Sequence, residues 1–256
     1  MTTGFDVDAT RIEEAGLNAL QTQRQLFFDG WLLRLSPGKA KRARSVNPCF
    51  GSSRPLDAKI DHCEALYASH GLPLLFRMTP FVRPPDLAPA LAAREYVEFD
   101  PTLVQAARID GARAAQCPKG IDLAAASAPE FVQAAGDLRG SSPLQRAAHL
   151  ERLTCSPLAL HAIVARSGGK VVACGLVIRD DTLAGIYDMM TADAQRGRGL
   201  ATTIVASLLQ WAARQGGTHA YLQVNADNAA ALAVYRRFGF ATMYTYHYCA
   251  RPGQCR

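Results

Sequence analysis

The hydrophobic and polar positions in the second half of the chain switch between the period of a buried strand and that of a helix. Residues 183–190 form an apolar run, which predicts a buried strand, and a polar stretch follows it up to Gly199. Apolar residues then recur at helical spacing as far as Gly216 and Gly217, where helices commonly end. The pattern predicts a strand, a glycine loop and a helix in succession.

Similar patterns predict the elements on either side of this unit. Two helices that each begin with serine and a nearby proline precede two strands joined by a Ser-Gly-Gly hairpin. A strand, a short helix and a last strand follow the unit. In chain order these are helices 127–138 and 142–153, strands 160–166, 170–179 and 219–224, helix 227–238 and strand 240–250.

The first half repeats this order of elements. It predicts strands 29–36 and 41–46, helix 56–71, strand 72–79, helix 86–94 and strands 95–99 and 102–109. An offset of 144 residues, from Leu56 to Leu200 and from Tyr96 to Phe240, places helix on helix and strand on strand. Any strand–helix protein matches itself when shifted, so chance is the alternative to duplication.

The length of 256 residues also exceeds one typical domain of about 100–150 residues. We predict an α/β (α+β) protein of two tandem halves, 1–115 and 116–256, with the boundary in the stretch 110–120. Each half is expected to hold a mixed, mostly antiparallel sheet flanked by helices.

The composition is that of a folded protein, with 49% apolar and 20% charged residues. No run of about 18 apolar residues occurs and the first residues are polar, so we expect neither a membrane span nor a signal peptide. Seven scattered cysteines without a C-x-x-C pair favour reduced thiols in a cytoplasmic protein over disulfides or a metal site.

The net charge of +6 favours an anionic partner. The basic residues gather in two runs rather than in an arm interleaved with aromatics, so a small anion is favoured over nucleic acid. The runs are Lys39, Lys41, Arg42 and Arg44, and Arg196 with Arg198.

The second of these runs lies in the predicted glycine loop. Arg196 and Arg198 meet the positive end of the following helix, an unfavourable placement unless an anion intervenes. Gly197 and Gly199 let the backbone approach a ligand and direct N–H groups toward it. The glycine patterns of nucleoside triphosphate and dinucleotide sites are absent. The loop therefore predicts another phosphate ligand; an ordinary tight turn is the alternative.

These features together resemble the acetyl-CoA signature of the GNAT N-acetyltransferase superfamily. The resemblance covers roughly residues 121–250, and the first half resembles a degenerate copy, as in tandem members of the superfamily. The residues that carry it are Arg196, Gly199, Ala201, Asn228, Tyr235, Gly239 and Phe240.

The resemblance implies roles for particular residues. The backbone of Arg196, Gly197, Arg198, Gly199, Leu200 and Ala201 would hold the coenzyme A pyrophosphate. Met189, Met190 and Thr191 would pair with the pantetheine arm and polarise the acetyl carbonyl. Asn228 would bind the same arm, and Tyr235 would be the general acid as well as a coenzyme contact. No metal is implied.

The general base is less defined. Asp188 is the only carboxylate in the strand before the loop, and apolar neighbours would raise its pKa. It serves equally well as a structural hydrogen-bond acceptor. His149, His161 and His247 are further candidates, and many members of this superfamily deprotonate the amine through ordered water.

The resemblance implies acetyl transfer from acetyl-CoA to a primary amine, with a small molecule as the expected acceptor. A protein or peptide amine and a non-catalytic acetyl-CoA sensor are the alternatives. Arg42 and Arg44, placed on one face of the predicted strand 41–46, are candidates to pair with an anionic acceptor, a solvated sheet edge being the alternative.

The signature residues are missing from the first half. At the 144-residue offset its positions are Ser52, Pro55, Pro84 and Leu91. We expect acetyl-CoA to bind only the second half. The superfamily usually closes with a pair of strands, yet only residues 240–256 follow Gly239. Either the final strand is missing, or the first half or a second subunit, hence a homodimer, supplies it.

Overall fold

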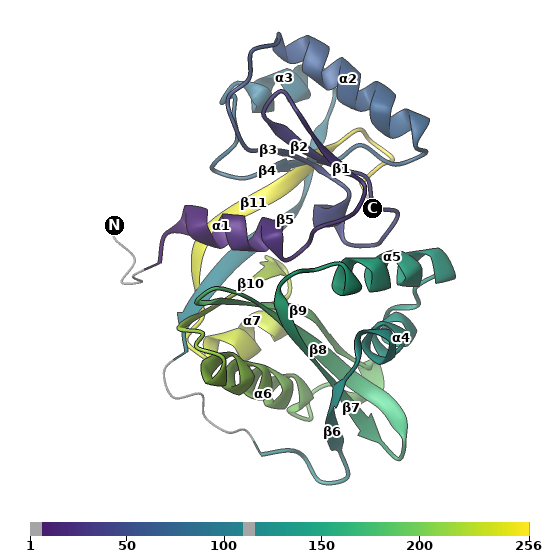
Figure 1. The fold of residues 1–256 in the computed structure, drawn as a ribbon, viewed down its shortest axis with the longest axis vertical. Coiled ribbons are helices and arrows are strands. Elements are labelled where there is room, and N and C mark those ends of the chain that lie inside the picture. The colour runs from purple at the N-terminus through teal and green to yellow at the C-terminus, as the bar shows by residue number, and fades with distance from the viewer. Residues whose placement is uncertain (1–6, 110–115, 256) are drawn as a thin grey trace.

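The computed structural model describes residues 7–109 and 116–255. Within them the strands form one 11-stranded mixed sheet in the order β1-β2-β3-β4-β11-β5-β10-β9-β8-β7-β6 (Figure 1). The strands are β1 Gln25–Phe28, β2 Trp31–Arg34, β3 Val46–Pro48, β4 Phe76–Met78, β5 Val97–Arg108, β6 Asp122–Ala126, β7 Ala159–Ser167, β8 Lys170–Asp180, β9 Leu183–Thr191, β10 His219–Asn225 and β11 Ala241–Ala250.

Helices cover both faces of this sheet. In the second half α6 packs on one face of β7–β9, and α4, with α5 beside it, packs on the other. The first half carries α2 and α3. The helices are α1 Ala9–Asn18, α2 Leu56–Ser69, α3 Leu87–Ala93, α4 Ala128–Arg139, α5 Pro143–Thr154, α6 Leu200–Arg214 and α7 Ala229–Arg236. No helix among the described residues is both long enough and apolar enough to cross a membrane.

The two halves exchange their last strands. β5, from the first half, lies between β10 and β11 of the second half and is antiparallel to both. β11 in turn pairs with β4 of the first half through His247, Tyr248 and Cys249. The missing closing strand of the second half is thus supplied by the first half. The two predicted sheets merge into one, which continues across the expected boundary; its residues 110–115 lie outside the described residues.

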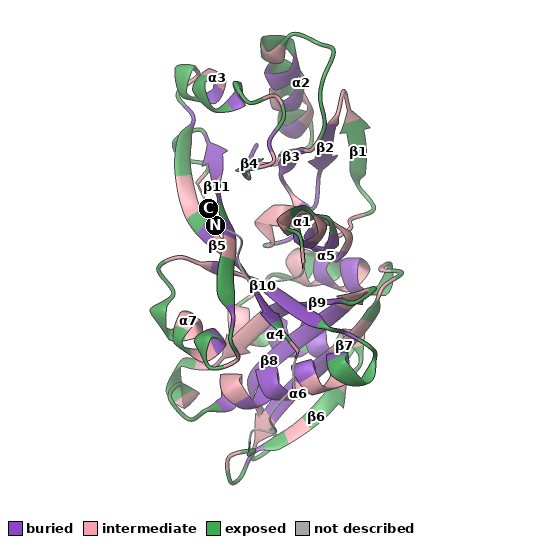
Figure 2. Ribbon diagram, turned by 90° about the vertical axis from the view of Figure 1, so that its left-hand side faces the viewer, coloured by how far each residue is buried: buried purple, intermediate pink, exposed green. Residues whose placement is uncertain are grey.

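Alternation along the strands divides the interior between the two faces. In β8, Cys174, Leu176 and Ile178 point to the core under α1 and α4, whereas Ala173 and Val177 point to the core under α6. A third core lies under α2 and α3. Figure 2 shows that the central strands of the second half are buried, while much of the outermost strands β1 and β6 is exposed.

Local signals account for several helix ends. Ser127 and Ser142 each cap a helix through a capping box, completed by Glu130 and Gln145. α2 and α6 start 144 residues apart, at Leu56 and Leu200, which agrees with the offset found in the sequence. The predicted α/β class and the tandem order of elements are confirmed.

Four segments of the first half differ from the prediction, the first being strand β1 at Gln25–Phe28, which was not predicted. Residues 41–46 are not one strand: Lys41–Ala43 form a 3-10 turn, and β3 starts only at Val46. The two strands predicted within 95–109 are one strand, which passes Asp100 at a φ of 55°. Helix α1 was not predicted at all. Its N-cap Asp8 accepts a hydrogen bond from the Thr10 N–H.

Candidate active site

The predicted phosphate loop, residues 196–201, lies at the start of α6 and is exposed up to Gly199. Gly197 and Gly199 have φ angles of 76° and 80°, a region that residues with a Cβ rarely adopt. A Cβ added at either glycine would meet nothing within 4 Å, so the space beside the loop is open. Leu200 is buried below and anchors the helix. The loop therefore presents accessible backbone.

The first turn of α6 has no side-chain cap. Its N–H groups form the positive end of a 15-residue helix and need a partner from outside it. Arg196 is 2.7 Å from Asp193 in an ion pair that is largely exposed to solvent. Arg198 donates to Gln195. Exposed pairs of this kind are weak, so both arginines can turn to an anion.

The corresponding loop of the first half already holds a carboxylate of the chain itself. Asp29 accepts hydrogen bonds from the backbone N–H groups of Ser53 and Arg54, each at 3.0 Å. These bonds are the main reason that the pKa of Asp29 lies far below its usual range. Ser53 and Arg54 correspond to Gly197 and Arg198 at the 144-residue offset. The Asp29 carboxylate thus binds backbone N–H groups whose counterparts in the second half, at Gly197 and Arg198, lie in the exposed loop.

Strands β9 and β10 separate at the end that leads to the loop. They pair in parallel only between residues 183–186 and 219–222. Beyond this point β9 continues against β8, and β10 against β5. Among the described residues, no strand pairs with residues 189–191 on the side that faced β10. On that side their backbone groups are not used by a neighbouring strand of the described chain.

A β-bulge near the end of β9 sets the direction of its side chains. Asp188 and Met189 together oppose Gly175 of β8, and Asp188 has a φ of 49°. A Cβ at Gly175 would lie 2.7 Å from Ile204 of α6 and would also collide with the Met189 sulfur. The bulge places Met189 against the α6 core, whereas Asp188 contacts helices α4 and α5 on the opposite face.

Tyr235 lies in α7, and Asn228 is the N-cap of the same helix. Tyr235 is buried, packs edge-on against Phe240, and burial raises its pKa to about 12. The phenol therefore keeps its proton at neutral pH, as a general acid must. Asn228 caps α7 by accepting from the Ala231 N–H at 3.1 Å. Its amide NH2 group is the part of the side chain that this cap does not use.

Asp188 lies among the basic side chains of Arg139, His149 and Arg152. Arg139 of α4 donates to Oδ1 at 2.7 Å, and His149 Nε2 of α5 lies 3.0 Å from Oδ2. Arg152 of α5 lies 3.9 Å from the same oxygen. Burial would raise the pKa of Asp188, but His149, Arg139 and Arg152 hold it well below its usual range. Such a carboxylate is a poor proton acceptor, which favours the structural role that the sequence left open.

No role was predicted for Arg139, Arg146 and Arg152 from the sequence. A signal was present, because Arg146, His149 and Arg152 recur at intervals of three along α5 and so share one helix face. The other two histidines considered as bases lie elsewhere. His161 stacks on Trp211, and His247 lies 3.4 Å from Glu98.

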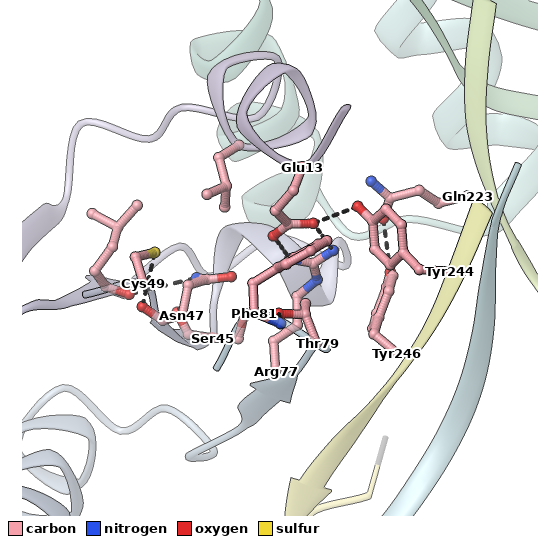
Figure 3. Close-up of polar contacts among 12 residues, drawn as sticks. Glu13, Ser45, Asn47, Cys49, Arg77, Thr79, Phe81, Gln223, Tyr244 and Tyr246 are labelled. Atoms are coloured by element: carbon pink, nitrogen blue, oxygen red, sulfur yellow. Dashed lines mark hydrogen bonds and ion pairs between the residues drawn. The ribbon is translucent and has the colours of Figure 1, made fainter. Parts of the chain in front are cut away.

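A polar network joins the halves beside the separated strands (Figure 3). Arg77 of β4 contacts the carboxylate of Glu13 of α1 through both terminal nitrogens, one of them at 2.9 Å. Tyr244 of β11 donates to Glu13 at 2.6 Å, and Tyr246 donates to Gln223 at 2.9 Å. Burial would raise the pKa of Glu13, but Arg77 and Tyr244 bring it below its usual value. Glu13 therefore stays charged and neutralises Arg77.

The basic run of the first half bridges to other elements instead of forming a strand or a solvated edge. Lys41 pairs with Asp100 at 2.9 Å, and Arg42 lies over the ring of Tyr187, 5.4 Å from its centre. Lys39 donates to the carbonyl of Arg139 at 3.0 Å. Strand geometry would send these side chains to alternate faces, whereas Lys41 and Arg42 in the 3-10 turn reach partners on two different strands, β5 and β9.

Solved structures of other proteins share this fold. A GCN5-related N-acetyltransferase from Kribbella flavida has a similar structure, with a TM-score of 0.72 and 18% identity over 97% of each chain. A tandem GNAT protein from the clavulanic acid biosynthesis pathway gives a TM-score of 0.61 and 16% identity, over 75% of this chain and 68% of that one. The chain therefore shares the fold of GNAT-type N-acetyltransferases.

Sequence comparison identifies the family. Residues 7–249 match the family described as "Probable histone acetyltransferase Rv0428c C-terminal", and the chain belongs to this family. The "Uncharacterized N-acetyltransferase YobR" of Bacillus subtilis (strain 168) is 26% identical over 253 residues, covering 94% of this chain and 98% of the relative. The predicted resemblance to GNAT acetyltransferases is confirmed.

Proposed function

We propose that the enzyme transfers the acetyl group of acetyl-CoA to the primary amine of a small molecule by direct attack. The observation that carries this proposal is the exposed loop 196–201, which starts an uncapped helix just after two strands that separate. The open space beside Gly197 and Gly199 fits a pyrophosphate, and the unpaired backbone of residues 189–191 fits the extended arm. Asn228 would add its amide NH2 group.

The chemistry follows from the residue types. Acetyl-CoA supplies a thioester when bound. Backbone N–H groups at residues 189–191 would stabilise the oxyanion that develops on the carbonyl. Tyr235 would give its proton to the departing thiolate, whose ordinary pKa near 8.5 makes this help modest. We assign Asp188 a structural role, in which its carboxylate holds Arg139 and Arg152. Ordered water, and not Asp188, would accept the proton of the attacking amine.

Only the second half is proposed to bind acetyl-CoA. In the first half the Asp29 carboxylate engages the loop N–H groups, and Pro55 and Leu91 stand at the positions of Gly199 and Tyr235. Calorimetric titration should therefore give one bound coenzyme per chain. Two per chain would contradict this assignment.

A lysine side chain of a protein is the second candidate acceptor, because the description of the matched family names a histone acetyltransferase. Arg42 and Arg44 are proposed to face the acceptor, and one terminal nitrogen of Arg42 is buried without a hydrogen-bond partner among the described residues. An anionic small molecule would suit these side chains better than a basic protein tail would.

Release of free coenzyme A thiol tests the function directly. The full-length protein is mixed with acetyl-CoA and a panel of small amines and lysine peptides, and free thiol is followed over time. We expect release that depends on the amine and on Tyr235. If acetyl-CoA binds and no amine in the panel releases thiol, the protein is a sensor and the proposed enzymatic role is wrong.

A further inference from the structure

The outermost strand of the first half, β1, leaves one edge of the sheet open. It pairs with β2 alone, whereas each inner strand of the sheet pairs on both sides. Figure 2 shows β1 at the side of the molecule, with most of its residues exposed. Its sequence, QLFF, contains neither a charged residue nor a proline. Natural proteins use such residues to keep an edge strand from pairing with another chain, so this edge lacks that protection.

The hydrogen bonds to β2 determine which backbone groups face the open edge. Leu35 donates its N–H to the carbonyl of Arg24 at 2.9 Å, so these two residues form a hydrogen-bonded pair. Hydrogen-bonded and non-hydrogen-bonded pairs alternate along antiparallel strands. In the observed register, the N–H and C=O groups of Gln25 and Phe27 therefore point away from β2. No turn, loop or cap of the described residues bonds to these four groups.

Large apolar side chains gather at the same edge. Five large hydrophobic side chains are exposed among the described residues, and three of them, Leu26, Phe27 and Phe50, lie here. Phe27 is 64% and Phe50 60% exposed, and their ring centres are 6.1 Å apart. Phe28 stacks on His62 of α2. Because side chains alternate along a strand, Leu26 lies on the α2 face of the sheet and Phe27 on the opposite face.

We propose that β1 pairs antiparallel with β1 of a second copy of this chain, about a two-fold axis that passes beside Leu26. In this register Leu26 lies opposite the partner's Leu26, and Gln25 lies opposite the partner's Phe27. All the outward N–H and C=O groups of both strands are then hydrogen-bonded. The edge is self-complementary, as an interface with two-fold symmetry requires.

The same register brings the exposed side chains together. The two copies of Leu26 meet on the α2 face, where they form a non-hydrogen-bonded pair with closely spaced side chains. The two copies of Phe27 lie on diagonal positions of the other face, within reach of aromatic side chains. Phe50 extends this contact. Arg24, which precedes β1, lies opposite the partner's Phe28, so no two charged residues of the paired segments are opposite each other.

The size of the contact indicates a weak dimer. Phe27 and Phe50 together expose roughly 250 Å² of each copy. A standard interface buries about 800 Å² on each partner, so this contact belongs to the small, transient class. We expect a dissociation constant in the micromolar range. The dimer differs from one in which a second subunit supplies the closing strand, because β5 of the first half already supplies that strand.

Sedimentation velocity of the full-length protein, from micromolar to hundreds of micromolar, tests the dimer. We expect the wild type to shift from monomer to dimer over this range. F27K should raise the dissociation constant at least about 100-fold, because a two-fold contact loses the ring twice and gains two charges. L144K is the matched control, at a leucine of α5 that is 63% exposed, and should dimerise as the wild type does. A wild type that stays monomeric, or an F27K that dimerises equally well, would overturn the inference.

A cysteine beside the two-fold axis tests the register. The Cα atoms of a non-hydrogen-bonded pair are about 4.5 Å apart, which suits a disulfide. In L26C the two new thiols face each other, so oxidised glutathione should oxidise them to a reducible cross-link and be reduced itself. Q25C places its thiols on diagonal positions about 7–8 Å apart and should cross-link far less. The wild type, with its seven native cysteines, gives the background. Stronger cross-linking of Q25C than of L26C would refute the register, and no cross-linking of L26C above background would refute the pairing.

Discussion

Replacing Asp188 with asparagine separates its two candidate roles. The change keeps the shape of the side chain and removes the negative charge that faces Arg139, His149 and Arg152. Removing one partner from a buried ion pair costs about 3–5 kcal/mol. Arg139 keeps 28% of its side chain exposed, so part of its charge is solvated and the lower end applies. For a chain of this size, about 3 kcal/mol corresponds to a fall in Tm of roughly 6–12 °C.

The assay is thermal and urea unfolding of D188N and the wild type at pH 7. D137N is the matched control, because Asp137 is 53% exposed and pairs with Arg146 at the surface of α4. Its cost should stay below about 1 kcal/mol. Since the pKa of Asp188 is lowered in the folded protein, its contribution is present above about pH 4 and is lost as the pH falls further. The difference between D188N and the wild type should therefore shrink in acid.

The kcat of D188N and its pH dependence distinguish a structural role of Asp188 from a role as the general base. If Asp188 only holds the arginines, folded D188N keeps the pH dependence of the wild-type kcat. A D188N that is as stable as the wild type would refute the reasoning from ion pairs. A folded D188N whose kcat falls by about 100-fold or more, with loss of the acid limb of the pH profile, would show that Asp188 is the base after all.

Three further substitutions test the site. G199V forces a β-branched residue to a φ of 80° and should abolish acetyl-CoA binding in calorimetry, whereas G71V, with the same kind of backbone strain at 63° in the first half, should bind normally. Y235F should lower kcat by about 100-fold, the low end for general acid catalysis, with little change in the KM of acetyl-CoA; an unchanged kcat would remove Tyr235 as the acid. G175A brings a Cβ to 2.7 Å from Ile204 and should cost about 1–3 kcal/mol in urea unfolding, and an unaffected G175A would mean that the bulge adapts.

Much of the second half could be predicted because its signals are local. The glycines of loop 196–201, the serine caps of α4 and α5 and the apolar run of β9 each act within a few residues, and the structure places those elements as predicted. The coenzyme and catalytic roles assigned to residues 189–201, Asn228 and Tyr235 stay predictions that the proposed experiments test.

The first half was harder to predict because its polar residues depend on distant partners. The run from Lys39 to Arg44 alternates like a strand in the sequence, yet Lys41 and Arg42 meet Asp100 and Tyr187 from other elements. These contacts with other elements outweigh the weak strand preference of a short segment. The same dependence on distant partners hid the basic residues around Asp188, which come from two other elements, α4 and α5.

The sequence by itself determined the class of fold, the tandem order of elements at an offset of 144 residues and the loop that precedes α6. These features depend on the spacing of apolar residues and on turn residues, which are close together in the chain. Only the tertiary structure decided that β5 and β11 change places, since strand pairing is settled by contacts between residues far apart in the chain. It also decided that Asp188 faces Arg139, His149 and Arg152, because these residues come together only in the packed interior.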